Sequence, residues 1–181
     1  MTGAQEPGNV STVAQRIATS ARDHPQRAYT SLAHYLDMDW LRAVWERTRK
    51  DDAVGIDRLT AERYAEDLEA NLADLLERAE AGSYRVPAVR RVHIPNGDGW
   101  RTRPIGIPTL EDKILQRAVA MVLEPLYEQD FVTGSFVFRP GRSAHQALQA
   151  VRSSMMPMRG GWVLELDIES FFIRTTSTCS G

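Results

Sequence analysis

A hairpin signal in the middle of the chain constrains the fold more than any other feature of the sequence. The letters NGDG, residues 96–99, separate two extended stretches, YRVPAVRRVHIP and WRTRPIGIP. Asn and Gly readily adopt the left-handed backbone of tight turns, so this pattern predicts an antiparallel β-hairpin. Pro87, Pro104 and Pro108 remove donors from the strand ladder, which limits the strands to a sheet edge or a strongly bent ribbon.

Before the hairpin, the sequence predicts helices. Residues 1–28 are polar and are expected to fray, with one short helical candidate at 13–21. Residues 29–50 predict a helix pair or one bent helix. Thr60 is expected to cap one long helix, and Gly82 follows that helix where a C-terminal glycine is common.

Two further helices are expected after the hairpin. Thr109 and Asp112 form a capping pair for a helix whose apolar side chains recur every 3.6 residues from 114 to 126. Pro125 is expected to kink or end that helix. Ser143 and Gln146 predict a capping box on a helix that follows a loop rich in Gly and Phe. The fold class predicted from these elements is α+β.

Charge is distributed unevenly along a chain whose net charge is only -2. Residues 1–84 hold 10 basic and 15 acidic side chains, whereas residues 85–181 hold 12 basic and 9 acidic ones. Five arginines and one histidine lie between residues 85 and 103 against a single aspartate, a local basic patch suited to phosphates. The alternative is a solvated hairpin without a partner. Arg outnumbers Lys by 20 to 2, which suits phosphate recognition but is also expected from a GC-rich genome.

The segment WVLELDI, residues 162–168, is expected to form a short buried strand that ends with a carboxylate. Alternation along it places Glu165 and Asp167 on one face, and the aromatic pair Phe171 and Phe172 follows. A hard cation such as Mg²⁺ binds one or two carboxylates together with substrate phosphates, so Asp167 is a candidate metal ligand. An aspartate in such a place is more often a helix cap or a loop anchor.

Composition excludes several classes of protein. No apolar run approaches the roughly 18 residues of a membrane span, and the start of the chain lacks the apolar core of a signal peptide. Cys179 is the only cysteine, which excludes an internal disulfide framework or a cysteine-based zinc site. A cytoplasmic location is therefore expected.

Four segments together carry a family resemblance. They are, in chain order, GIDRLTAERY, VRRVHIPNGDGWRTRPIGIPTLEDKILQRAVAMVLEPLYE, SFVFRPGRSAHQAL and WVLELDIESFF. This combination resembles the N-terminal part of group II intron reverse transcriptases, the intron-encoded maturases, over residues 55–172. The resemblance implies a mostly helical fingers-type region with a β-hairpin that ends at the first strand of an incomplete palm. It divides the chain into an N-terminal polar and helical extension (1–54), a partial reverse-transcriptase domain (55–172) and a tail (173–181).

The resemblance also implies roles for particular residues. Asp167 matches the first catalytic aspartate, which binds both metal ions, and the backbone of Ile168 would help to bind metal. Phe172 matches the aromatic residue that favours deoxynucleotides, and Arg103 matches an arginine that holds the incoming triphosphate. The implied cofactor is Mg²⁺, and the implied partners are intron RNA or an RNA template together with deoxynucleotides.

Nucleic-acid contacts are expected in two places. The hairpin would contact RNA through Arg90 and Arg91. The loop before the last helix would contact it through Arg139, Arg142 and the helix start at Ser143. For the loop arginines, salt bridges within the loop and helix remain the alternative.

The sequence departs from the family pattern in two respects. Asn96 stands where the family usually has a lysine, so a triphosphate contact would be lost or passed to Arg101. Ile173 stands where an Asp is usual, and the sequence contains no Tyr-X-Asp-Asp turn, although two-metal chemistry needs several carboxylates. Back-translation of RTTSTCSG shifted by one base can read DNVDLLR, so we expect a frameshifted or truncated product with a disordered tail.

Three hypotheses follow for function. The first is an RNA-directed DNA polymerase fragment that is inactive alone, and the second is a non-catalytic module that binds intron RNA. The third is a helical interaction domain with an accidental match. An uncovered strand at 162–168 would also favour association through an exposed palm edge.

Overall fold

The structure is a computed structural model that describes residues 8–95, 102–158 and 160–168. The chain divides into two compact units, Met1–Phe131 and Val132–Gly181. Helices and one antiparallel strand pair make up the described elements, so the predicted α+β class is confirmed.

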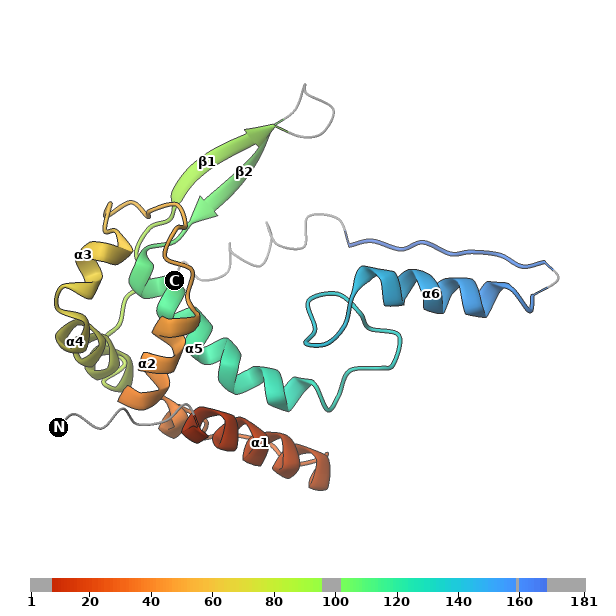
Figure 1. Ribbon diagram of the computed structural model, residues 1–181, viewed down its shortest axis with the longest axis horizontal. Coiled ribbons are helices and arrows are strands. Elements are labelled where there is room, and N and C mark those ends of the chain that lie inside the picture. Colours follow the sequence, from red (N-terminus) through yellow and green to blue (C-terminus); the bar gives the residue numbers. More distant parts are fainter. Residues whose placement is uncertain (1–7, 96–101, 159, 169–181) are drawn as a thin grey trace. The chain divides into compact units, whose positions relative to one another are not determined.

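The first unit contains most of the secondary structure (Figure 1). Its elements in chain order are α1 (Gly8–Asp23), the 3₁₀ helix η1 (Ala33–Tyr35), α2 (Met38–Arg47), α3 (Ala61–Ala65), α4 (Leu68–Glu80), β1 (Arg90–Pro95), β2 (Thr102–Ile107) and α5 (Leu110–Tyr127).

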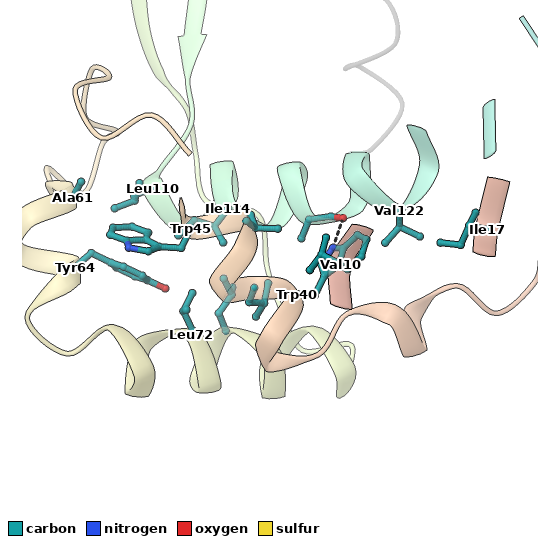
Figure 2. Close-up of a cluster of buried hydrophobic side chains, with 14 residues drawn as sticks. Val10, Ile17, Trp40, Trp45, Ala61, Tyr64, Leu72, Leu110, Ile114 and Val122 are labelled. Carbon is teal, nitrogen blue, oxygen red and sulfur yellow. Dashed lines mark hydrogen bonds between the residues drawn. The ribbon is translucent and has the colours of Figure 1, made fainter. Parts of the chain in front are cut away.

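The core of this unit forms where α2 lies between α4 and α5 (Figure 2). Four residues of α2 are buried, and they follow the 3.6-residue period: Trp40, Leu41, Val44 and Trp45. The indole Nε1 of Trp40 donates a hydrogen bond of 3.1 Å to the backbone oxygen of Ala118 in α5, so this large side chain is buried with its polar atom satisfied. Ile114, Ala118 and Val122 form the buried stripe of α5 that the sequence predicted.

The N-terminal helix is longer and more firmly packed than the sequence indicated. We expected residues 13–21 to be helical within a fraying segment, but α1 extends over Gly8–Asp23 and packs against α5. Val10, Ile17 and Ala21 are buried. Residues before 55 thus share one core with those after it, and the division at 54/55, drawn from the resemblance, stays a prediction.

The long helix expected after Thr60 is interrupted, and in this respect the prediction was wrong. Thr60 does cap a helix, accepting a hydrogen bond from the backbone N–H of Arg63 at 3.3 Å, but that helix ends at Ala65. Asp67 leaves the helical region with φ -126° and ψ 44°, and α4 begins at the next residue. Because the Asn71 amide donates to the backbone oxygen of Tyr64 at 2.9 Å, a carbonyl at the break keeps a partner.

The predicted turns and caps are otherwise confirmed in the described residues. Gly82 has φ 64° just after α4, a conformation that favours glycine. Thr109 caps α5 through the backbone N–H of Asp112, and Pro125 lies within the last turn of that helix. The strands β1 and β2 pair antiparallel, whereas the turn at 96–99 falls outside the described residues.

The described residues of the second unit form one helix, α6 (Ala144–Met155), which begins with the predicted capping box between Ser143 and Gln146. Residues 161–168 are extended but form no strand with any described residue, so the expected buried strand is not found. Trp162, Leu164 and Leu166 are at least 79% exposed. A strand becomes buried only when neighbouring strands or helices cover it, and among the described residues nothing pairs with this segment.

Candidate nucleic-acid interface

The register of the two-stranded ribbon decides which arginines share a face. Arg91 lies opposite Gly106, and Ile94 lies opposite Arg103. Side chains alternate between faces along a strand, and directly paired residues lie on the same face. Arg90 and Arg103 therefore belong to one face of the ribbon, and Arg91 and His93 belong to the other.

The two faces differ in burial. The face of Arg90 and Arg103 also carries Val92, Ile105 and Ile107, which are half-buried. On the opposite face Arg91, His93 and their partners are all exposed. The predicted basic patch thus exists as exposed cations on both faces of a narrow ribbon, and it is not one flat surface.

Arg90 has a second role at the base of the ribbon. Its Nε donates a hydrogen bond of 3.0 Å to the backbone oxygen of Val54, in the loop that connects α2 to α3. Lys113 of α5 donates to the neighbouring backbone oxygen of Ala53 at 2.8 Å. These two contacts join the loop to both the ribbon and α5, so part of the charge of the patch is used to hold the fold.

Gly55 allows the same loop to approach α5 closely. A Cβ atom at this position would lie 2.7 Å from the Cα of Thr109 and 2.9 Å from the backbone oxygen of Pro108. Both are backbone atoms at the end of β2 and the start of α5, which leaves no room for a side chain. Glycine at position 55 therefore fixes the distance between the loop and the base of the ribbon.

A polar network holds the segment that enters the ribbon. The guanidinium of Arg78 in α4 contacts Asp74 at 2.7 Å and Glu111 of α5 at 3.0 Å. Tyr84 donates a hydrogen bond of 3.4 Å to Asp112, and Gln116 donates to the other oxygen of that carboxylate at 2.6 Å. The chain thus leaves α4 and enters the hairpin along a fixed path on α5.

Burial is the main cause of the pKa shift in this network. It raises the pKa of Tyr84 to about 12, with further contributions from the charges of Asp112 and Glu111 and from the hydrogen bond to Asp112. Burial also raises the pKa of Tyr64, whose hydroxyl is the buried side-chain atom without a hydrogen-bond partner in the described residues. Both phenols therefore stay neutral at physiological pH.

The predicted arginines of the second unit lie in the loop before α6 and take part in its internal contacts. Arg139 donates from one Nη to the backbone oxygens of Val132 at 3.2 Å and Ser135 at 2.9 Å. The guanidinium of Arg142 lies 5.6 Å from the ring centre of Phe136. Ser143 accepts a hydrogen bond from Gln146 in the capping box, which occupies its side chain. These contacts order the loop.

Asp167 and Ile168 lie at the end of the exposed extended segment. One carboxylate oxygen of Asp167 accepts a hydrogen bond of 2.9 Å from the backbone N–H of Ile168. In the part of the chain that the structure describes, no three His, Cys, Asp or Glu side chains gather so that they could hold a metal ion. The described residues do not by themselves fit the two-metal site of a polymerase, although Asp167 could supply one ligand oxygen.

Two predicted site residues, Arg101 and Phe172, and the tail at 173–181 fall outside the described residues. Sequence reasoning also missed the contacts that position the ribbon, which join Arg90 to Val54 and Arg78 to Glu111. These pairs are 36 and 33 residues apart, and no local pattern identifies partners at such separations. For the close packing of this loop the sequence offers one local signal, the glycine at position 55.

Comparison with known proteins gives a consistent set of relatives. Protein YkfC of Escherichia coli K12 is 34% identical over 170 residues, which are 90% of this chain and 44% of that protein. Group II intron-encoded protein LtrA of Lactococcus lactis is 30% identical over 164 residues, which are 88% of this chain and 26% of LtrA. Nuclear intron maturase 2 of Arabidopsis thaliana is 50% identical over 42 residues, 23% of this chain and 6% of that protein.

The chain belongs to the group II intron-encoded reverse transcriptase and maturase family. The predicted resemblance is thereby confirmed, and the similarity extends over far more than the quoted motifs. No protein-family model matches the chain. The chain spans less than half of the length of YkfC and about a quarter of LtrA. Among the described residues, no helix is long and apolar enough to cross a membrane.

Proposed function

We propose that this chain binds RNA through the exposed arginines of its β-ribbon, as the fingers-type part of a group II intron reverse transcriptase. The observation that carries this proposal is the ribbon itself, which presents Arg91 and Arg103 on opposite faces while Arg90 ties its base to the body. A narrow ribbon with cations on both faces can contact two phosphate strands or both sides of a groove. The intron-related names of the relatives support RNA as the partner.

The loop before α6 is proposed as a second contact. Arg142 is exposed there beside Phe136, and the internal hydrogen bonds of Arg139 hold the loop in shape. A guanidinium beside an aromatic ring is suited to contact both the phosphate and the base of an unpaired nucleotide.

We propose nucleotide binding and nucleotidyl transfer only for the complete active site of the family. Arg103 would contact the triphosphate with Arg101, Phe172 would contact the sugar, and Asp167 with the backbone of Ile168 would bind Mg²⁺. Because such chemistry needs several carboxylates around two metal ions, we expect RNA binding without DNA synthesis from these 181 residues alone.

Salt dependence of RNA affinity tests the ribbon. The variant Arg91→Gln/Arg103→Gln removes one cation from each face and leaves the Arg90 contact to Val54 in place. Each lost phosphate contact should reduce the slope of log affinity against log salt by roughly 0.7–0.9, so the double variant should lose roughly 1.5. The control Arg63→Gln/Arg117→Gln removes the same charge from exposed helical positions and should change the slope little.

Fluorescence anisotropy with a labelled RNA stem-loop measures this slope directly. An equal slope for the ribbon variant and the wild type would show that RNA binds elsewhere. A primer-extension assay with Mg²⁺ provides the second arm. Template-dependent synthesis that disappears in Asp167→Ala would contradict the expectation of binding without catalysis.

A further inference from the structure

A groove lies between the C-terminal ends of α1 and α5, apart from the ribbon. Its volume is about 270 Å³, and residues 21–32 and 123–130 contribute its lining. Arg22 at the end of α1 donates to the side chain of Gln129 just after α5 at 3.3 Å, which holds the two helix ends together. The helices also pack against each other through the core, so the groove has fixed walls.

The lining of this groove combines apolar side chains of α5 with two tyrosines. Leu123 and Leu126 of α5 line the groove and are half-buried. Tyr29 is half-buried, and its hydroxyl donates a hydrogen bond of 3.0 Å to the hydroxyl of Ser20, which fixes the ring. Tyr127 remains 52% exposed at the end of α5. Such a lining suits a planar ring with apolar faces.

The rim of the groove is cationic on one side. The guanidinium carbon of Arg27 lies over the Tyr29 ring, 5.5 Å from its centre, so a positive charge is held against one face of this ring. His24 and the carboxylate of Asp130 also line the groove, and they offer hydrogen-bonding atoms. A planar ring in the groove with an anionic group near Arg27 matches one nucleotide, and the volume is too small for a base pair.

We propose that this groove binds a single unpaired nucleotide of an RNA strand, with its base against Tyr29 and Tyr127 and its phosphate at Arg27. The choice of an RNA strand over a free nucleotide rests on the proposed function. The groove and its lining are independent of the ribbon. Stacking of an unpaired base on tyrosine is a general means of RNA recognition, and it tolerates different bases.

Two RNA probes separate this groove from the ribbon. One is a labelled blunt hairpin, and the other is the same hairpin with a 3′ extension of unpaired adenosines. The ratio of the two dissociation constants measures the contribution of the single strand. For the wild-type chain the extended probe should bind at least several-fold more tightly, because stacking of one base contributes roughly a factor of ten to affinity.

The variant Arg27→Gln/Tyr127→Leu should lower this ratio to near one and leave the affinity for the blunt hairpin nearly unchanged. Both side chains are exposed, so the fold should tolerate the change, and a thermal melt checks this. Arg27→Glu alone provides a second variant with both tyrosines intact, and it should also lower the ratio. Arg63→Gln is the matched control and should leave the ratio as in the wild type.

The ribbon variant Arg91→Gln/Arg103→Gln should weaken both probes by the same factor and leave the ratio unchanged. If it weakens neither probe while the groove variants lower the ratio, the ribbon proposal fails and the groove stands. A ratio near one for the wild type, or an unchanged ratio in both folded groove variants, would overturn the groove proposal.

Discussion

Substitution of Gly55 by alanine tests how the ribbon is held to the body of the protein. The added Cβ would lie 2.7 Å from the Cα of Thr109 and 2.9 Å from its backbone nitrogen. Carbon atoms without a bond between them do not approach so closely, and the opposing atoms belong to the backbone, so the loop must move away. We expect the variant to fold, but with a displaced loop.

The magnitude follows from the contacts that this displacement affects. Forcing a methyl group into a filled site costs roughly 1–3 kcal/mol. Separating the loop from the ribbon also weakens the 3.0 Å hydrogen bond from Arg90 to Val54, which contributes roughly 1 kcal/mol. The free energy of unfolding should therefore fall by about 2–4 kcal/mol. In a unit of this size the melting temperature should fall by roughly 10 °C.

Gly82→Ala is the matched control for this prediction. Gly82 has φ 64°, but no atom beyond its two chain neighbours lies within 4 Å of the position that a Cβ atom would take, so alanine meets only backbone strain of roughly 1 kcal/mol. Urea denaturation followed by the fluorescence of Trp40 and Trp45 measures both variants in one assay. If Gly55→Ala is no more destabilising than Gly82→Ala, the loop does not pack against α5 as described.

Two further predictions concern the core and the polar network. Trp40→Phe should reduce the free energy of unfolding by about 1–3 kcal/mol, because it removes the hydrogen bond to Ala118 and leaves a small cavity; equal urea midpoints would contradict this. Tyr84 has a folded-state pKa of about 12, above its ordinary value near 10, so its contribution is complete below pH 10 and is lost as pH rises towards 12. Tyr84→Phe should therefore lose less stability than the wild type between pH 9 and pH 11.5, as urea midpoints at the two pH values would show.

Local signals in the sequence predicted the elements whose formation depends on nearby residues. The cap at Thr109, the capping box at Ser143 and the glycine after α4 each involve residues within four positions of one another. The hairpin was likewise predicted, because its two strands are close in sequence and a turn signal separates them. Periodicity alone also identified the buried stripe of α5.

Features that depend on distant residues were predicted poorly. The break at Asp67 was not predicted, because the residues on both sides of it are compatible with a helix. Asn71 stabilises the break by donating a hydrogen bond to the backbone oxygen of Tyr64. The buried positions of α1 are seven and four residues apart in a polar segment, so their role became clear only through packing against α5. Burial of residues 162–168 was inferred from alternation, but alternation indicates a potential face and does not supply the neighbour that covers it.

The ribbon shows why a count of basic residues is a poor guide to a binding surface. Arg90, Arg91 and Arg103 contribute equally to the local charge, but their contacts differ. Arg90 is bonded to the backbone at Val54, so its removal would change the base of the ribbon as well as its charge. Arg91 and Arg103 are exposed on opposite faces, where a ligand can reach each one from a different side. Arginines of one ribbon can therefore stabilise the fold at one end of a strand and bind RNA along the rest of it. Variants that replace all the arginines together cannot separate these two effects.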